Sequence, residues 1–146
     1  MKYEKLTESN ISILVKMYKD YYNNSEECCW TYDKAFKRIH QVMTMEDSMC
    51  LIQKDDNDKI TGFEIGYFKE YDDLSSFFLE EIVIFAEYQD RGYGSLFLKE
   101  IESKILSNNC KHLELLSIND EKHIHFYTKA GLYSAKNLVI MGKHYS

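Results

Sequence analysis

The sequence of 146 residues contains no proline, so its turns depend on asparagine, aspartate, serine and glycine. Its four cysteines, at positions 28, 29, 50 and 110, show neither the spacing of a zinc site nor a disulfide framework. The adjacent pair is also badly placed for mutual bridging, so we interpret all four as reduced thiols. His123 and His125 stand two apart in an expected helix, on different faces, and we therefore expect no metal site.

Long apolar runs are absent too. The longest, residues 82–86, is far short of the ~20 residues that a membrane-spanning helix needs. The amino terminus, MKYEKLTESN, lacks the apolar core of a signal peptide. These absences predict a cytoplasmic protein that has no membrane partner.

An excess of positive charge is also missing. The formal net charge is −6 and the basic residues are scattered, so we expect no binding of nucleic acid or of an anionic membrane surface. A cationic partner is the more natural expectation. Hydrophobic residues make up 45% of the chain, and no linker-like or repeated stretch divides it, which predicts one domain over residues 1–146.

The most informative stretch is residues 77–105, FFLEEIVIFAEYQDRGYGSLFLKEIESKI. Its apolar, β-branched start predicts a strand over residues 77–85, and apolar residues then recur at helical spacing. The turn between strand and helix would present backbone N–H groups without partners, which is a site for an anion. Gly92 and Gly94 keep side chains away from such a ligand and allow unusual backbone angles.

Two common phosphate motifs do not fit this turn. A dinucleotide fingerprint requires a third glycine at position 97, which is Phe, and a P-loop requires a Gly-Lys-Ser or Gly-Lys-Thr triplet, which occurs nowhere. Residues 89–94, QDRGYG, instead resemble the Gln/Arg-x-x-Gly-x-Gly/Ala signature of the GNAT superfamily, the acyl-CoA-dependent N-acetyltransferases.

The rest of the chain predicts an α/β fold. Strands are expected at residues 2–6, 48–54, 59–69, 77–85 and 112–117, and helices at 11–21, 31–44, 92–105 and 121–130. A closing strand is expected at 138–143, preceded by a short one at 132–134. Gly62 and Gly66 within one strand indicate a bulge or a close backbone approach. The order β-α-α-β-β-β-α-β-α-β-β predicts a mixed central sheet flanked by helices.

This order is that of GNAT proteins, and a second motif of the family is present. Residues 126–132, FYTKAGL, resemble the family's aromatic-Tyr-x-x-x-Gly-Phe ending, with Leu132 in the last position. The resemblance covers essentially the whole chain, and it implies the GNAT fold with acetyl-CoA as the co-substrate. The sequence departs from the family at Ala86, where a proline is common.

The resemblance also implies catalytic residues. Tyr127 would protonate the departing CoA thiolate, and Glu80 or Glu114 would take a proton from the amine. Successive side chains of a strand alternate, so only one of Glu80 and Glu81 is expected to face the site, and Glu80 matches the position used in polyamine-type members. The alternatives are a rim carboxylate that merely attracts a cation and, for Tyr127, an aromatic packed on the core.

For the thioester, the resemblance implies main-chain N–H groups exposed where the central strand splays from its neighbour, at Ile82, Val83 and Ile84. The resemblance also implies that the pyrophosphate of CoA binds at the turn formed by Gln89, Asp90, Arg91, Gly92, Tyr93, Gly94 and Ser95. Asn119 is a further candidate for cofactor binding, with Asp120 as the alternative because the interval to Tyr127 is one residue longer than usual. Glu26, Glu27, Trp30 and Asp33 lie where the family builds its acceptor wall, or they form a solvated helix start.

Together these features predict an N-acetyltransferase that moves acetyl from acetyl-CoA directly to a primary amine. The acceptor would be a small cationic molecule or a protein amino terminus. One alternative is a catalytically silent module that senses acetyl-CoA or docks a partner, and another is a nucleotide-binding domain with coincidental motifs. The sequence does not identify the amine. It also does not set the oligomeric state, and a homodimer is one of the open alternatives.

Overall fold

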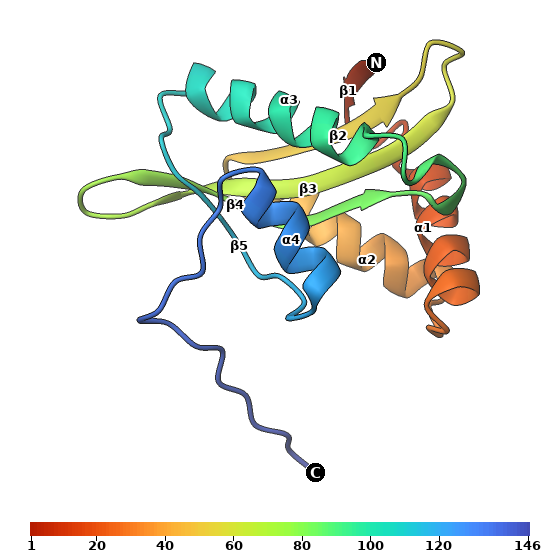
Figure 1. The fold of residues 1–146 in the computed structure, drawn as a ribbon. Coiled ribbons are helices and arrows are strands. Elements are labelled where there is room, and N and C mark those ends of the chain that lie inside the picture. The colour runs from red at the N-terminus through yellow and green to blue at the C-terminus, as the bar shows by residue number, and fades with distance from the viewer. The chain divides into compact units, whose positions relative to one another are not determined.

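The computed structural model describes residues 1–146 (Figure 1). The chain forms two compact units, Met1–Leu116 and Ser117–Ser146, and each is described by itself. The expectation of one domain over the whole chain stays a prediction.

The first unit is built on a five-stranded mixed sheet with the spatial order β1-β2-β3-β4-β5. The first four strands pair antiparallel, whereas β5 runs parallel to β4. The strands are β1 (Lys2–Lys5), β2 (Ser48–Lys54), β3 (Ile60–Glu70), β4 (Ser75–Ile84) and β5 (Leu113–Leu115). The five strands predicted for this part of the chain are confirmed, with slightly shifted ends.

Helices α1 (Ile11–Ser25) and α2 (Tyr32–Met43) cover one face of this sheet, and α3 (Tyr93–Ser107) covers the other (Figure 1). A short 3₁₀ helix, η1 (Ala86–Tyr88), follows β4. The helix α2 begins as its sequence predicts, because Thr31 accepts a hydrogen bond from the Lys34 N–H at 3.2 Å as its N-cap.

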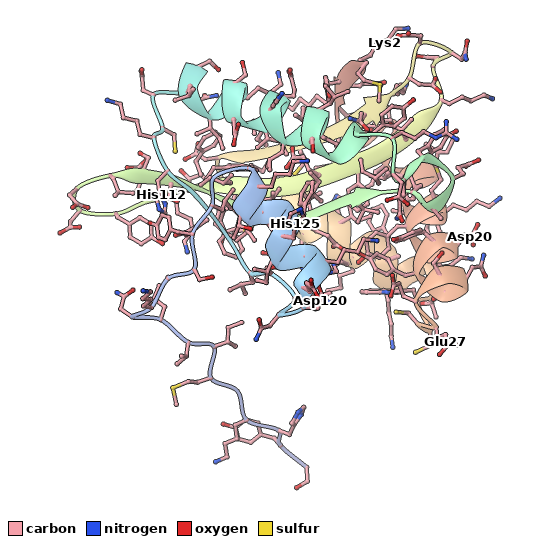
Figure 2. All side chains as sticks on the ribbon, in the orientation of Figure 1. Lys2, Asp20, Glu27, His112, Asp120 and His125 are labelled. Carbon is pink, nitrogen blue, oxygen red and sulfur yellow. The ribbon has the colours of Figure 1, made fainter.

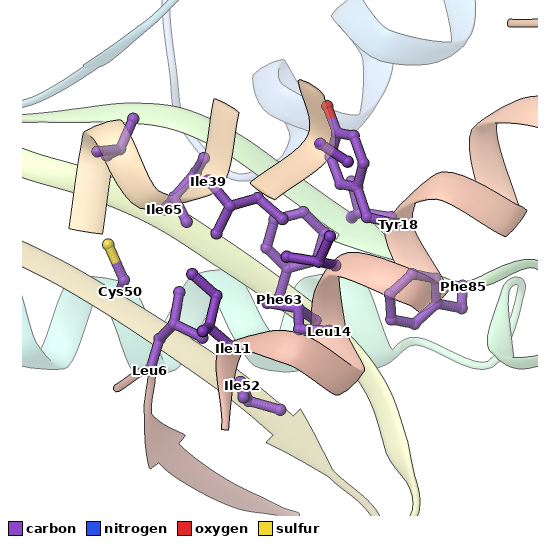
Figure 3. Close-up of a cluster of buried hydrophobic side chains, with 14 residues drawn as sticks. Leu6, Ile11, Leu14, Tyr18, Ile39, Cys50, Ile52, Phe63, Ile65 and Phe85 are labelled. Atoms are coloured by element: carbon purple, nitrogen blue, oxygen red, sulfur yellow. The ribbon is translucent and has the colours of Figure 1, made fainter. Parts of the chain in front are cut away.

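The main core lies between α1, α2 and the sheet (Figure 3). Apolar residues recur at helical spacing in both helices and alternate along the strands, so each element presents one apolar face. The buried members of this core are Leu6, Ile11, Leu14, Val15, Tyr18, Ala35, Ile39, Val42, Cys50, Ile52, Phe63, Ile65, Val83 and Phe85.

A buried polar side chain, Gln53 of β2, ties the other face of the sheet to α3. Its Nε2 donates to the Tyr93 carbonyl at 3.1 Å, and its Oε1 accepts from the Thr61 hydroxyl at 2.7 Å. Beside it, the ring of Tyr3 packs on that of Phe97 with centroids 5.2 Å apart. The first turn of α3 is therefore fixed to the sheet by both polar and aromatic contacts.

The strand β4 carries one extra residue relative to β3. Ile65 lies opposite Glu81, but the next residue, Gly66, lies opposite Leu79, so Glu80 has no partner in the ladder. This is a β-bulge, and in a structure with a two-residue period it exchanges the faces of all the residues that follow.

The two glycines of β3 allow the close approach of β4. A Cβ on Gly62 would lie 2.4 Å from the Val83 carbonyl oxygen, and one on Gly66 would lie 2.6 Å from that of Phe78. Neither position accepts a side chain without movement of the backbone. The bulge or close approach predicted from these glycines is confirmed.

The second unit contains one helix, α4 (Glu121–Lys129). Gly131 has a φ of 97° and ends it, with hydrogen bonds from the Leu132 N–H to the Tyr127 carbonyl and from the Gly131 N–H to the Thr128 carbonyl, both at 3.0 Å. This is a left-handed glycine cap, and the helix ends close to the predicted residue 130.

No strand follows α4, and the strands predicted at residues 132–134 and 138–143 are wrong. The apolar side chains from Leu138 to Met141 are 70% exposed or more. An apolar, β-branched run forms a strand only where a neighbouring strand takes its backbone hydrogen bonds, and none pairs with this run. The predicted order of elements holds through α4.

Candidate active site

The turn between β4 and α3 presents a group of unpaired backbone donors. The helix begins at Tyr93, and the Leu96 N–H bonds back to the Gly92 carbonyl at 3.1 Å. The N–H groups of residues 90–95 donate to no other part of the chain. Both Asp90 and Gly92 have positive φ, 61° and 80°. A turn of this kind at a helix N-terminus binds an anion.

Gln89 holds this turn in place. Its Nε2 donates to the Ile84 carbonyl at 2.7 Å and to the Tyr21 hydroxyl at 3.0 Å, which links β4, the turn and α1. Arg91 remains exposed, with its guanidinium 5.8 Å from the centroid of the Tyr88 ring. The turn thus combines a fixed backbone with one accessible positive charge.

The edge of β4 is open on the β5 side beyond Leu79, where the pairing with β5 ends. On the other side, the Phe85 N–H donates to the Thr61 carbonyl at 2.9 Å. Because hydrogen-bonded pairs alternate along an antiparallel ladder, Ile82 and Ile84 direct their N–H groups away from β3.

This alternation reduces the number of backbone amides that can serve the thioester site implied by the sequence. Val83 lies opposite Phe63, so its amide is directed toward β3 and its side chain lies in the core. Ile82 and Ile84 remain as donors for a carbonyl oxygen on the open side.

Two carboxylates of β4 meet one arginine of α2. The Nη1 of Arg38 lies 2.8 Å from Glu80 Oε1, and its Nη2 lies 3.4 Å from Glu81 Oε2. The expectation that Glu80 and Glu81 point to opposite faces is therefore wrong. The bulge is the reason, because it exchanges the faces between these two residues and leaves both side chains toward α1 and α2.

Two tyrosines of α1 complete this group. The Tyr22 hydroxyl donates to Glu81 Oε1 at 2.6 Å, and the Tyr18 hydroxyl lies 3.2 and 3.3 Å from the two Glu81 oxygens. The two tyrosines stand at i and i+4 and therefore share one face of the helix. We call Tyr18, Tyr22, Arg38, Glu80 and Glu81 the Arg38 cluster.

The sequence pointed to only part of this cluster. The i, i+4 spacing of Tyr18 and Tyr22 was a usable signal, since two hydroxyls on a buried face need a polar partner. Arg38 gave no such signal, because its partner Glu80 lies 42 residues away and on another element.

Burial is the largest cause of the pKa shifts of Glu81, Tyr18 and Tyr22 in the Arg38 cluster. It raises the pKa of Glu81 above its ordinary value, opposed by the Tyr22 hydroxyl, the Arg38 guanidinium and the Tyr18 hydroxyl. Burial also raises the pKa of both tyrosines, and the Glu81 charge adds to that effect. Both hydroxyls are therefore protonated donors at neutral pH, and Glu81 is a carboxylate that accepts a proton more readily than an exposed glutamate.

Glu114, the second predicted base, has different partners. Its Oε1 lies 3.0 Å from the Lys69 ammonium and accepts from the Tyr71 hydroxyl at 2.9 Å. Partial burial opposes ionisation, but the ammonium and the hydroxyl outweigh it and lower the pKa of Glu114. A carboxylate held ionised in this way is a weaker proton acceptor than Glu81.

The second unit contains the remaining predicted residues. Asp120 is the N-cap of α4: its Oδ1 accepts from the His123 N–H at 2.8 Å and lies 2.7 Å from the His123 Nδ1. Asn119 precedes it and is exposed. Tyr127 lies in α4 with its ring 5.0 Å from that of Phe126. The roles of Asn119 and Tyr127 toward CoA stay predictions.

The predicted acceptor wall is partly structural. The Trp30 ring packs edge-on against Tyr18 with centroids 5.2 Å apart, and the backbone N–H of Trp30 donates to Asn23 Oδ1 at 2.7 Å. Glu26 and Glu27 are exposed in the loop after α1, where Figure 2 labels Glu27. No group of three or more His, Cys, Asp or Glu side chains is arranged to hold a metal. None of the helices has the length and hydrophobicity needed to cross a bilayer.

The sequence profile of the Acetyltransferase (GNAT) family matches residues 12–132, which is most of the chain. The chain belongs to the GNAT acetyltransferase family. Solved structures agree with this assignment of the fold. A probable acetyltransferase has a TM-score of 0.80 at 14% identity, with 100% of this chain and 99% of that chain covered. A GNAT family acetyltransferase from Staphylococcus aureus subsp. aureus USA300_TCH1516 has a TM-score of 0.74 at 18% identity, with 99% and 98% covered.

A third similar structure is an aminoglycoside acetyltransferase from an uncultured soil metagenomic sample. Its TM-score is 0.70 at 9% identity, with 99% of this GNAT chain and 98% of that chain covered. No curated protein sequence matches the chain. The GNAT fold predicted from the sequence, a mixed sheet flanked by helices, is confirmed.

Proposed function

We propose that this GNAT protein transfers acetyl from acetyl-CoA directly to a primary amine, carried by a small cationic molecule or by a protein amino terminus. Membership of an acetyltransferase family supports the reaction class. The observation that carries the choice of co-substrate is the turn at residues 90–95, whose free N–H groups suit the pyrophosphate of CoA. The open edge of β4 beside it suits the thioester carbonyl.

The acceptor side of the proposal rests on the Arg38 cluster. Two carboxylates face one guanidinium, so the cluster carries an excess negative charge when both carboxylates are ionised, and this attracts an ammonium group. An alkyl ammonium has a pKa of about 10.4 and must lose a proton before it can attack a thioester. The aminoglycoside acetyltransferase of similar fold acts on a cationic class of acceptor, which agrees with this choice.

Thermal unfolding in the presence of acetyl-CoA, ATP and NAD, each in turn, tests the co-substrate. At ~100 times its dissociation constant, acetyl-CoA should raise the free energy of unfolding by about 2.7 kcal/mol, with no comparable effect of ATP or NAD. The absence of a shift with acetyl-CoA would overturn the proposal, and stabilisation by ATP or NAD instead would favour a nucleotide-binding domain.

Release of the CoA thiol then tests turnover. Acetyl-CoA is incubated with a panel comprising putrescine, spermidine, an aminoglycoside and a peptide with a free amino terminus. We expect amine-dependent thiol release with at least one member. Binding of acetyl-CoA without release for any of them would favour a silent sensor of acetyl-CoA.

A further inference from the structure

We propose that Glu81, and not Glu80, takes the proton of the acceptor amine, and that Arg38 is the positioning residue that separates the roles of these two adjacent carboxylates. The inference rests on the proposed function and specifies the proton acceptor for it.

Glu80 is held as the counter-ion of Arg38. Its Oε1 lies 2.8 Å from Nη1, which is a short charge-assisted hydrogen bond. The Glu80 side chain keeps 27% of its surface exposed and has no other side-chain partner. The Glu80 carboxylate is therefore committed to Arg38 and serves as its counter-ion.

Glu81 has mainly neutral partners. Two tyrosine hydroxyls donate to it, the shorter at 2.6 Å, whereas Arg38 approaches only to 3.4 Å. Its side chain is 14% exposed, so a small part of it remains accessible while the rest is removed from water. Protonation of Glu81 leaves the Arg38 and Glu80 pair intact and removes a poorly solvated charge. Burial raises its pKa accordingly.

The proton balance follows from this arrangement. An N–H bond of the acceptor ammonium breaks and an O–H bond forms on the Glu81 carboxylate, which leaves a neutral amine. The amine nitrogen attacks the thioester carbon, the C–S bond breaks, and the second nitrogen proton passes to the departing thiolate. The proton on Glu81 returns to solvent, so the net reaction of ammonium and thioester gives amide, free thiol and one proton.

Arg38 acts through both glutamates. Its ion pair fixes Glu80, and its charge beside Glu81 limits how far burial raises that pKa. Without the guanidinium, Glu81 would lie beside the Glu80 carboxylate with no cation to oppose it, and the pKa of Glu81 would rise further.

Carbon-13 NMR of the glutamate side-chain carboxyls tests the assignment without turnover. In a Glu64→Gln background, which removes the other buried glutamate of raised pKa, we expect one carboxyl signal to titrate above the rest and to persist when Glu80→Gln is added. The signal should be missing in Glu81→Gln, and it should move to higher pH in Arg38→Met but little in Arg38→Lys. Loss of the signal in Glu80→Gln, with retention in Glu81→Gln, overturns the assignment.

The pH dependence of kcat/KM, with acetyl-CoA and the best amine of the panel, tests the role. Glu81→Gln should lose activity by at least about 100-fold and lose the acidic limb of the profile. The adjacent control, Glu80→Gln, should keep that limb and mainly raise KM. Arg38→Met should shift the limb to higher pH, and Arg38→Lys should restore it, which a purely structural role would not do.

The two proposals fail in different ways. If acetyl-CoA neither binds nor is consumed with any amine, the proposed function is wrong and the role of Glu81 falls with it. If amines are acetylated but Glu81→Gln retains the wild-type profile, the function stands and the inference about Glu81 is wrong.

Discussion

Among the single residues of the chain, Glu64 of β3 is buried without a hydrogen-bond partner for either carboxyl oxygen. Its neighbours Phe63 and Ile65 face the core under α1 and α2, so the alternation of the strand places Glu64 on the side of α3. Burial raises the pKa of Glu64 well above its usual range, and the Lys104 charge opposes this only in part.

The pKa of Glu64 predicts how stability depends on pH. The folded chain holds a proton on Glu64 that the unfolded chain loses near pH 4.3, so this residue favours folding at low pH. The free energy of unfolding should fall as pH rises from there toward the folded pKa, by up to about 1.4 kcal/mol per pH unit. Urea unfolding between pH 5 and pH 8 measures this slope.

Glu64→Gln should remove this contribution to the slope, because the amide does not titrate. The matched control is Glu46→Gln, since Glu46 is exposed and the substitution should leave the slope as it is. Equal slopes in Glu64→Gln and in the wild type would contradict the prediction.

At the scale of secondary-structure elements, the first turn of α3 depends on the buried amide of Gln53. Its Nε2 donates to the Tyr93 carbonyl and to the Tyr3 hydroxyl, and its Oε1 accepts from the Thr61 hydroxyl. The anion turn before α3 therefore has an anchor on β2 in addition to Gln89 on the turn itself.

Gln53→Leu should lower the free energy of unfolding by about 1–3 kcal/mol, because buried polar groups lose their partner. It should also weaken acetyl-CoA binding, since the helix start is no longer fixed. Gln41→Leu, at an exposed position of α2, serves as the control for both measurements. Chemical unfolding and ligand titration report the two effects, and an unchanged affinity in Gln53→Leu would show that the anchor does not act on the turn.

Local sequence was sufficient to predict the elements whose hydrophobic pattern and packing partners favour the same structure. The two glycines of β3 signalled the close approach of β4, and Gly131 signalled the end of α4. The closing strand failed because a strand also needs a partner, which composition does not supply. The sequence did not predict that the bulge lies at Glu80 of β4. Register is a property of two paired strands, and the sequence of β4 alone is that of an uninterrupted strand.

At the scale of the whole molecule, the sequence located the turn between β4 and α3 but not the Arg38 cluster. The turn is one continuous segment, and its backbone conformation is determined largely by its own residues. The Arg38 cluster joins α1, α2 and β4, and its geometry depends on packing between elements. The expected alternation of β4 allowed only one of Glu80 and Glu81 to face the site, and the match to polyamine-type members favoured Glu80. The reversal at the bulge removes the first of these two grounds.

The exposed run from Leu138 to Met141 predicts a tendency to self-associate. Four adjacent large apolar side chains, each 70% exposed or more, form an apolar surface without backbone partners. Ile140→Lys should lower concentration-dependent light scattering without changing the far-ultraviolet circular dichroism. Lys136→Ile, which adds an apolar side chain near the same run, should increase the scattering, and equal scattering of all three proteins would refute the prediction.

The bulge of β4 also affects how the Arg38 cluster can change during evolution. Removal of the single codon for Glu80 would leave Leu79 and Glu81 as consecutive residues opposite Gly66 and Ile65, the partners they already have. The rest of the strand, with its core side chains and its open amides, would keep its orientation. One small deletion would therefore remove a negative charge from the Arg38 cluster and leave the register of the sheet unchanged, so the charge of the cluster and the fold can evolve separately.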